Sequence, residues 1–440
     1  MSENAQEIYK QKTTTYEEIV KKLKSPLNAS TGNAAAKAHQ FFFALGEHGD
    51  HIDEIHLSMA NTFEAEYPIY FRDGVDIKTG FYGPLERKSS RQRNNVEFRP
   101  LQFCDGKKSL ELGGPGPDIY VVVTGPMGED GYFNLGLSAS VDYDFIQQWG
   151  PDPNTIVVVQ ANSKMPHVSG IEEYGGHRFH ISQVDCIVES DEPVVELGRQ
   201  IATEADKRMA EYVADLVEDG STVQFGFGAL PDVVAERLTS KKELGIHTEM
   251  IGDGCMELIR SGAVTNEHKP EHKGKSIATF AWGSQELYDW IDHNEEVCLV
   301  PVIHVNYPPV LHRQHKMTSI NSILQIDLRG QATAHCLNGS TYSGLGGHFE
   351  HTYGAQLSPG GKSILCLRSC ADLSTGRVSN VLAQFPAGTG ITTPEFIVDW
   401  VVTEWGAVQL KWLSMEERKE AIIGIAHPDF REELKQQAGV

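Results

Sequence analysis

The sequence has few of the features that mark secreted, membrane-bound or metal-dependent proteins. Its seven cysteines form no CxxC pair, and this odd, scattered set indicates buried thiols in a reducing compartment rather than a disulfide framework. Cys366 and Cys370 match no zinc-ligand spacing, so no metal is expected. No apolar run reaches membrane-spanning length, and the polar start, MSENAQEIYKQK, lacks a signal-peptide core. The expected compartment is therefore the cytoplasm, with no membrane partner.

Basic residues are also scarce. The chain has 38 lysines and arginines against 60 aspartates and glutamates, a formal net charge of −22. This imbalance argues against non-specific binding to nucleic acids and to anionic membrane surfaces. A polyanionic ligand would have to be held by backbone amides and a few local cations, because the overall field opposes its approach.

What is present is typical of a large α/β protein. The 440 residues, 40% of them hydrophobic and 22% charged, are enough for two or three domains with sizeable cores. Asp118–Thr124 and Thr155–Gln160 read as buried strands, and strands that alternate with helical segments predict mostly parallel sheets. A polar, acidic stretch at residues 188–195 suggests a boundary between an N-terminal domain, 1–195, and a C-terminal domain, 196–440.

The first hundred residues carry weaker signals. An apolar stripe predicts one amphipathic helix over residues 7–25, and a polar turn around Gly32 and Asn33 precedes a helix predicted over Ala34–Leu45. Residues 75–100 read as an irregular, polar loop. That loop holds a basic cluster that is either solvated or able to meet ligand phosphates or carboxylates: Arg87, Lys88, Arg91, Arg93 and Arg99.

The chain is organised around the run GSTVQFGFGALPDVVAERLTSKKELGIHTEMIGDG, residues 220–254. Thr222–Phe227 predicts a strand, Gly226 and Gly228 a tight turn, and Pro231 the first residue of a helix. Ile246–Ile251 then predicts a second strand, with Glu249 near its carboxyl end.

Two interpretations of this run are open. In an open parallel sheet ligands sit beyond the carboxyl ends of the strands, so the glycine turns and Glu249 would face one crevice. Alternatively, the glycines only make turns and the glutamate is solvated. A nicotinamide-dinucleotide site is disfavoured, because GxGxxP lacks the third glycine of the dinucleotide fingerprint, and no GK[ST] follows to form a P-loop.

Several separated stretches, in the right order, resemble the acetyl-CoA hydrolase/transferase family, in particular its 4-hydroxybutyrate and butyryl/acetate CoA-transferases. They include GSTVQFGFGALPDVV, LGIHTEMIGDG, NSILQIDLRGQ, YSGLGGHF, GGKSIL, WVVTEWG and IAHPDFREEL, with GPMGEDGYFNLGLSASVDY in the first half. The resemblance is nearly continuous from about residue 115 onwards.

The resemblance implies a fold and a chemistry. The fold is two related open α/β domains, with mostly parallel sheets, that face each other across a cleft. The activity is the transfer of CoA from a short-chain acyl-CoA to a small carboxylic acid, by a ping-pong route through a glutamyl-CoA thioester. Coenzyme A is then a substrate rather than a permanent cofactor, and family habit suggests a homodimer or a larger homo-oligomer.

The resemblance also assigns roles to residues. Gln325 stands where some relatives carry glutamate, and because an amide cannot form the acyl anhydride, Glu249 is the expected nucleophile, with Gln325 near the substrate. Gly346 and Gly347 resemble a loop whose amides could stabilise an oxyanion, and Lys362 resembles a CoA-contacting lysine. The turn along which CoA is expected to lie comprises Gly226, Phe227, Gly228, Ala229 and Leu230.

The sequence departs from the family pattern around the acceptor. GGHFEH replaces GGQxDF at residues 346–351, TTPEF replaces TTSR at 392–396, and NASTGNAAAKAH does not match the usual first loop. The acceptor could therefore be a dicarboxylate such as itaconate or succinate, with the basic cluster as counter-charge. His247, two residues before Glu249, reads either as a donor to the site or as a satisfied core histidine. Two rival functions are an acyl-CoA hydrolase on the same scaffold and a catalytically decayed acyl-CoA-binding protein.

Overall fold

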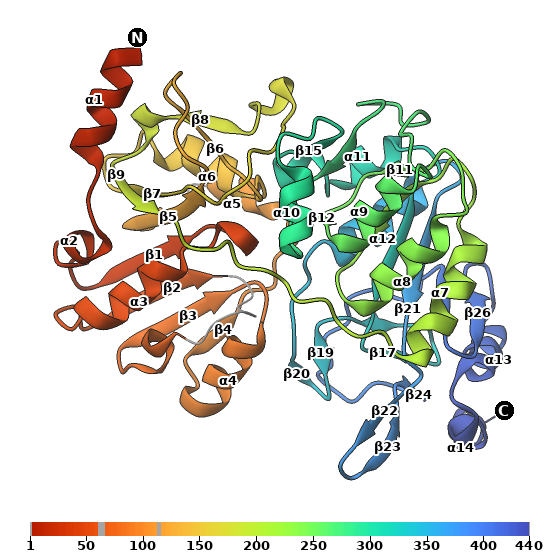
Figure 1. The fold of residues 1–440 in the computed structure, drawn as a ribbon. Coiled ribbons are helices and arrows are strands. Elements are labelled where there is room, and N and C mark those ends of the chain that lie inside the picture. Colours follow the sequence, from red (N-terminus) through yellow and green to blue (C-terminus); the bar gives the residue numbers. More distant parts are fainter. Residues whose placement is uncertain (1, 60–66, 112–115, 440) are drawn as a thin grey trace. The chain divides into compact units, whose positions relative to one another are not determined.

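The computed structural model describes residues 2–59, 67–111 and 116–439, and it divides the chain into two compact units (Figure 1). Unit 1 comprises Met1–Leu197 and Ile277–His304, and unit 2 comprises Gly198–Ser276 and Val305–Val440. The first division lies close to the expected boundary. Residues 277–304, which the sequence placed in the C-terminal domain, instead belong to unit 1. Nothing in the local sequence marks this return, because the alternation of strand and helix continues through it.

Unit 1 is built on a parallel seven-stranded sheet of order β4-β3-β2-β1-β5-β7-β9. Its strands are β1 (Leu27–Thr31), β2 (Ile55–Met59), β3 (Val75–Thr79), β4 (Val96–Phe98), β5 (Ile119–Thr124), β7 (Ile156–Asn162) and β9 (Cys186–Ser190). Every residue of β5 is buried, as expected of a β-branched strand that is covered on both faces. The predicted strands over Asp118–Thr124 and Thr155–Gln160 are thereby confirmed.

The helices of unit 1 correct two predictions. The single helix predicted over residues 7–25 is two helices, α1 (Ser2–Lys12) and α2 (Tyr16–Val20), because the Thr15 hydroxyl accepts the Glu18 N–H and starts a new helix. The helix predicted over Ala34–Leu45 begins only at His39, as α3 (His39–His48), since the residues before it belong to β1 and a short 3₁₀ turn.

The prediction of a loop over residues 75–100 is wrong. That stretch forms β3, helix α4 (Pro84–Arg93) and β4; Pro84 opens the helix and the Glu86 carboxylate accepts the Gly83 N–H at 2.8 Å. Four residues of the basic cluster therefore lie on a capped helix. Arg93 pairs there with Asp73, and Arg87 donates to the Tyr82 carbonyl at 3.2 Å.

The remaining elements of unit 1 are short. Helices α5 (Asp105–Glu111), α6 (Asp142–Trp149) and α10 (Gln285–Ile291) accompany the strands β6 (Tyr132–Asn134), β8 (Arg178–His180), β14 (Phe280–Ala281) and β15 (Val297–Leu299), while β13 (Ser276–Ala278) crosses the boundary. Residues 276–281 thus form two short strands rather than one continuous strand.

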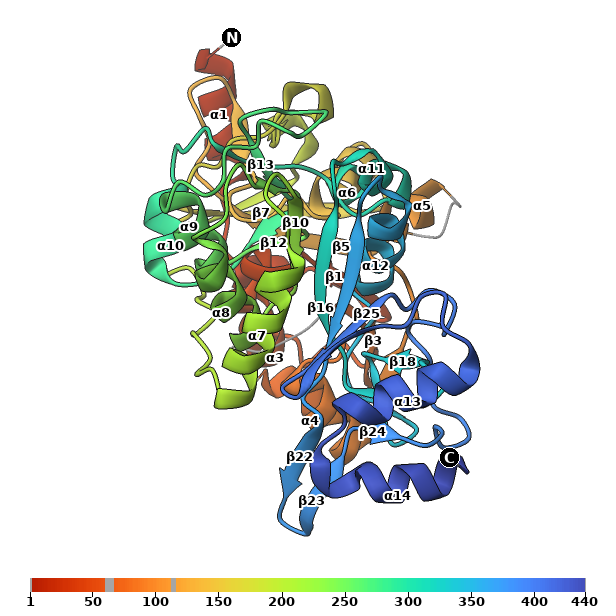
Figure 2. The same cartoon turned by 90° about the vertical axis from the view of Figure 1, so that its right-hand side faces the viewer.

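Unit 2 is built on a six-stranded sheet of order β11-β10-β16-β21-β25-β26, parallel except for the last pair. Its strands are β10 (Thr222–Phe225), β11 (Gly245–Ile246), β16 (Thr318–Ser322), β21 (Lys362–Cys366), β25 (Trp400–Thr403) and β26 (Gly406–Gln409). Its helices are α7 (Glu204–Leu216), α8 (Ala229–Leu238), α9 (Asp253–Arg260), α11 (Pro308–Arg313), α12 (His348–Leu357), α13 (Met415–Ile425) and α14 (Pro428–Ala438). The last two lie side by side (Figure 2).

Short strands extend beyond this sheet. A three-stranded sheet joins β17 (Gln325–Asp327), β18 (Ala332–Thr333) and β24 (Val381–Leu382), and two hairpins pair β19 (Cys336–Leu337) with β20 (Ser340–Thr341) and β22 (Cys370–Leu373) with β23 (Gly376–Ser379). Among the described residues, no helix has the length and apolar character needed to cross a membrane.

Candidate active site

The glycine turn of unit 2 follows β10 at the carboxyl edge of the sheet, where ligands bind in such folds. Gly226 donates its N–H to the Ile320 carbonyl at 3.0 Å, which holds the turn against β16. Gly228 has φ 116°, a conformation that favours glycine, and it stands at the N-terminus of α8. The helix thus begins at Ala229, two residues before the predicted Pro231, with Ala229 and Leu230 buried in its first turn and Phe227 exposed.

Glu249 lies where the second predicted strand is interrupted. Instead of one strand over Ile246–Ile251, the chain forms β11 and then β12 (Met250–Ile251), which belongs to a different two-stranded sheet. Between them the Thr248 hydroxyl accepts the Phe225 N–H and donates to the Phe225 carbonyl, both at 3.2 Å. The Thr248 side chain thus replaces the backbone hydrogen bonds of a strand pair. Because Thr248 is held to Phe225, the last residue of β10, the next residue, Glu249, is fixed at the end of that strand.

The Glu249 carboxylate is held by two donors within unit 2. Asn306 Nδ2 donates to Oε2 at 2.6 Å, and the Gly347 N–H also donates to the carboxylate. The side chain keeps partial exposure, while burial of the carboxyl group raises its pKa from 4.5 to about 7 against the opposing effect of these hydrogen bonds. Near neutral pH Glu249 therefore exists both as the acid and as a weakly solvated carboxylate of raised basicity.

Asn306 connects Glu249 to a second, deeper carboxylate. The same Nδ2 donates to Glu350 Oε2 at 2.7 Å, and Glu350 is fully buried. Two carboxylates on one nitrogen fix the orientation of the amide, because its oxygen could accept from neither. Glu350 therefore holds the NH₂ group of Asn306 toward Glu249.

Gly347 has to be a glycine for steric reasons. It stands at the N-terminus of α12, and a Cβ atom at this position would overlap Glu249 Oε2 and Asn306 Nδ2. His351 Nδ1 lies 3.0 Å from the Gly347 carbonyl, so that nitrogen carries the proton. Burial lowers the pKa of His351 to about 4, and the ring is neutral. Gly346, just before, has φ 49° and allows the chain to turn into the helix.

His247 belongs to the core. Its Nε2 lies 3.0 Å from the Val305 carbonyl, and burial lowers its pKa well below the usual value. Of the two interpretations of this residue, the satisfied core histidine is the one that these contacts support. The ring anchors the segment that leads into Asn306.

Lys362 lies at the other end of the sheet. It is the first residue of β21, level with Thr318 at the start of β16, whereas the glycine turn follows the carboxyl end of β10. Its Nζ donates to Glu218 Oε1 at 2.6 Å and to the Leu216 carbonyl at 3.0 Å. The structure thus does not bring Lys362 together with Glu249.

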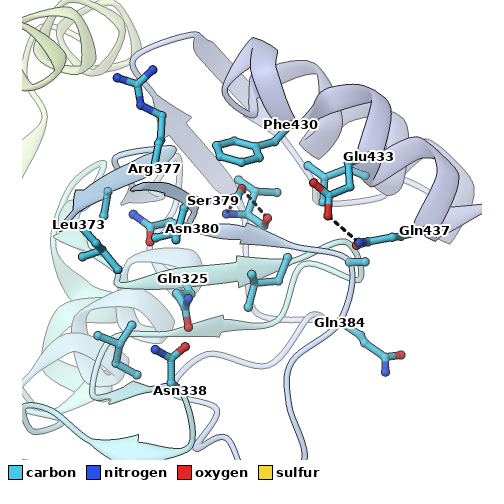
Figure 3. Close-up of a pocket in the computed structure, with 17 residues that line it drawn as sticks. Gln325, Asn338, Leu373, Arg377, Ser379, Asn380, Gln384, Phe430, Glu433 and Gln437 are labelled. Carbon is cyan, nitrogen blue, oxygen red and sulfur yellow. Dashed lines mark hydrogen bonds between the residues drawn. The ribbon is translucent and has the colours of Figure 1, made fainter. Parts of the chain in front are cut away.

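Gln325 is not among the residues that hold the Glu249 carboxylate. It begins β17 and lines a pocket of about 560 Å³ between β24, the β22–β23 hairpin and α14 (Figure 3). The described residues that line this pocket include none of those that surround Glu249.

Two of the stretches that depart from the family pattern contact each other. His348 Nε2 lies 2.9 Å from Thr393 Oγ1, which joins the altered GGHFEH and TTPEF stretches, and Arg329 binds Glu395 at 2.7 Å. These substitutions are therefore accommodated by partners within unit 2. Among the described residues, no three His, Cys, Asp or Glu side chains are grouped as metal ligands.

Sequence reasoning missed Asn306 and the role of Glu350. Asn306 lies in HVNYPPV, 57 residues after Glu249, and only the fold places the two side chains together. Glu350 was noticed only as a departure from the family pattern. A polar residue two positions before a helix that opens with two prolines was the one available signal for Asn306.

Comparison with known proteins identifies the family. The acetyl-CoA hydrolase/transferase N-terminal domain matches residues 1–197, and the C-terminal domain of the same name matches residues 283–438. A succinyl-CoA:cyclohexane-1-carboxylate CoA transferase from Geobacter metallireducens is 36% identical over 84% of this chain and 83% of its own length. The chain belongs to the acetyl-CoA hydrolase/transferase family.

Two further relatives span nearly the whole chain. A 4-hydroxybutyrate coenzyme A transferase from Clostridium kluyveri is 33% identical over 98% of this chain and 97% of its own. The crystal structure of RipA from Yersinia pestis, 33% identical, covers 99% of this chain and 98% of its own with a TM-score of 0.88. The expected family and mostly parallel α/β fold are confirmed.

Proposed function

We propose that this protein is a CoA-transferase that moves CoA from a short-chain acyl-CoA to a small carboxylic acid, with Glu249 as the nucleophile. The observation that carries the proposal is the Glu249 carboxylate itself. It lies at the carboxyl edge of a parallel sheet with a raised pKa, and it accepts hydrogen bonds from Asn306 and Gly347.

The first half-reaction uses the free oxygen of Glu249. Oε1 attacks the thioester carbonyl, the C–S bond breaks, and CoA leaves as a thiolate from an acyl-glutamyl anhydride. The thiolate then attacks Cδ of Glu249, releases the original acid as its carboxylate, and leaves a glutamyl-CoA thioester. No general base is required, because an ionised carboxylate is already a nucleophile.

The second half-reaction runs the same steps with an acceptor acid. The acceptor carboxylate attacks Cδ and displaces CoA thiolate, which then attacks the new acyl carbon of the mixed anhydride and restores free Glu249. Each attack on Cδ places negative charge on Oε2. Asn306 Nδ2 already lies 2.6 Å from that oxygen, and the Gly347 N–H is a second donor to the carboxyl group, so both are suited to stabilise the tetrahedral intermediate.

Substrate positions are part of the proposal. We infer that CoA lies along the glycine turn, residues 226–230, whose missing Cβ atoms allow close approach. The acids to test first are 4-hydroxybutyrate, butyrate, acetate and the dicarboxylates succinate and itaconate, and the relatives named above act on succinyl-CoA, cyclohexane-1-carboxylate and 4-hydroxybutyrate by their names. We expect no permanently bound cofactor, and a homo-oligomeric assembly.

Intact-protein mass spectrometry tests the mechanism. After incubation with acetyl-CoA or butyryl-CoA, we expect a CoA adduct on Glu249 that disappears when an acceptor acid is added. Glu249→Gln, which keeps the side-chain shape, should bind acyl-CoA without forming the adduct. If the adduct is lost only by hydrolysis and never by transfer to an acceptor acid, the protein is a hydrolase. Binding of acyl-CoA without any adduct in the unaltered protein would make it a decayed binding protein.

A further inference from the structure

The pocket lined by Gln325, hereafter the Gln325 pocket, has a defined construction. Strands β17 and β24 form its floor, α14 one wall and the β22–β23 hairpin the other, as Figure 3 shows. Gln325 lies three residues past the end of β16, so the pocket opens beyond the same carboxyl edge of the sheet that carries the glycine turn. Its volume of about 560 Å³ is within the range of small-molecule sites.

The side chain of Gln325 has an unsatisfied hydrogen-bond acceptor. Its side chain is 5% exposed, and its Oε1 has no hydrogen-bond partner among the described residues. An acceptor buried without a donor is destabilising, and proteins rarely keep one unless something fills it. In Figure 3 the carboxamide points toward Asn338, another residue of the pocket lining. Oε1 itself is buried, so a ligand N–H donor reaches it only after the carboxamide turns toward the pocket.

The pocket has one cation, which is already paired, and one carboxylate. Arg377 donates to Asp372 at 2.8 Å and lies 3.5 Å from Asp429, and Glu433 accepts from Gln437 at 3.0 Å. No other side chain that lines the pocket is charged. The chain's net charge of −22 also opposes an anion here. The pocket is therefore suited to the uncharged part of a ligand.

Its remaining lining combines carboxamides with apolar surface. Gln325, Asn338 and Asn380 contribute amides, while Leu382, Phe430 and Leu434 contribute apolar or aromatic surface. Carboxamides recognise adenine by accepting from its amino group and donating to a ring nitrogen, and aromatic or apolar side chains pack on the faces of such a ring.

We propose that the Gln325 pocket binds an adenine ring, with Gln325 Oε1 accepting from the exocyclic amino group and Nε2 donating to the adjacent ring nitrogen. Two ligands supply this ring: the nucleotide end of CoA, which rests on the proposed function, and a free adenine nucleotide, which does not. In both cases the phosphates remain outside the pocket, because Arg377 is already paired with two carboxylates and Glu433 repels an anion.

Calorimetric titration with adenosine tests the pocket directly. Unaltered protein should bind adenosine and not guanosine, whose ring carries an oxygen where adenine carries the amino group. Gln325→Met, of nearly the same size, should weaken adenosine binding at least tenfold. Gln436→Met is the matched control, because Gln436 is an exposed residue of α14 outside the pocket lining and should leave binding unchanged.

Thermal unfolding separates loss of recognition from loss of fold. Gln325→Met removes an unpartnered acceptor, so its unfolding temperature should equal or exceed that of the unaltered protein. Absence of adenosine binding by the unaltered protein, equal binding of guanosine, or undiminished binding by a folded Gln325→Met would each overturn the proposal.

Competition identifies the source of the ring. If CoA displaces adenosine while pantetheine does not, the pocket takes the nucleotide end of the substrate, and Gln325→Met should raise KM for acyl-CoA without preventing the Glu249 adduct. If ATP or AMP displaces adenosine and CoA does not, the adenine site holds a free nucleotide. If no CoA adduct forms on Glu249, the proposed function fails, but the adenosine-binding and competition results remain valid.

Discussion

At the scale of single residues, the reactivity of Glu249 depends on two opposing influences. Burial raises its pKa to about 7, whereas the hydrogen bonds from Asn306 and Gly347 lower it. Higher basicity makes the carboxylate a better nucleophile, provided that it is still ionised at working pH. The two donors limit the rise in pKa, and Asn306 binds Oε2, so Oε1 is the oxygen assigned here to the attack.

The fit of Gly347 against Glu249 yields the first prediction at this scale. Gly347→Ala places a methyl group where Glu249 Oε2 and Asn306 Nδ2 now lie, so both must move. We expect formation of the glutamyl-CoA adduct to slow by about 100-fold, as on loss of an oxyanion donor. Rapid-quench mass spectrometry measures this rate.

Gly424→Ala is the matched control for that variant. Gly424 is an exposed residue of α13, and a Cβ there would meet no atom within 4 Å, so the adduct rate should not change. A Gly347→Ala protein with an unchanged adduct rate would show that Gly347 does not shape the reacting group.

At the scale of elements, the first turn of α12 supplies most of the support around Glu249. Gly347 at its start offers the N–H, Glu350 in the same turn holds Asn306, and His351 binds the Gly347 carbonyl. One helical turn therefore fixes both a direct donor and the orientation of a second donor from the segment before α11. A rigid element of this kind can keep a reacting group in place better than a loop can.

The buried link between Glu350 and Asn306 gives the second prediction. Glu350→Ala frees the amide of Asn306, and we expect kcat to fall about 10- to 100-fold with little change in KM for acyl-CoA. Glu350→Gln should recover most of the activity, because its amide oxygen can still accept from Asn306 Nδ2. Steady-state kinetics measures kcat and KM, and the unfolding temperatures of the same variants show whether a loss of activity comes from a loss of stability. Equal loss in both variants would contradict a positioning role.

The sequence predicted strands and glycine turns better than it predicted contacts. The apolar runs that became β5, β7 and β10 were recognised because a β-branched run has few alternatives once buried. The strand around Glu249 was not predicted to break, because the break depends on the hydroxyl of Thr248 replacing the ladder to β10. Local pattern carries no information about a partner strand.

The site residues divide in the same way. Glu249 and Gly347 were both expected, and the structure brings them together, whereas Asn306 became visible only through the fold. The resemblance suggested Lys362 but not which edge of the sheet it occupies. Pairing with Thr318 places it at the amino edge, where Glu218 binds it.

At the scale of the whole molecule, each unit buries one carboxyl group whose pKa is raised to about 7. In unit 1 this group is Asp142, which accepts from Tyr120 and Ser138 at 2.7 Å, and in unit 2 it is Glu249. Both carboxyls titrate near 4 in the unfolded chain. Between pH 4 and 7 these two groups therefore bind more protons in the folded protein than in the unfolded chain, and their contribution to stability falls as pH rises through this window. Buried neutral histidines such as His348 and His351 contribute with the opposite sign, so the effect of Glu249 is seen only as a difference between variants.

Glu249→Gln should remove the contribution of unit 2 to this pH dependence. The variant should unfold at the same temperature as the unaltered protein near pH 4 and at a higher temperature near pH 7, because only the unaltered protein then bears a buried charge. Each pKa unit corresponds to about 1.4 kcal/mol, so the gain is at most about 3 kcal/mol and levels off above pH 7. Scanning calorimetry from pH 4 to 8 measures the difference. A difference between the two proteins that did not vary with pH would mean that Glu249 is not desolvated in the folded protein.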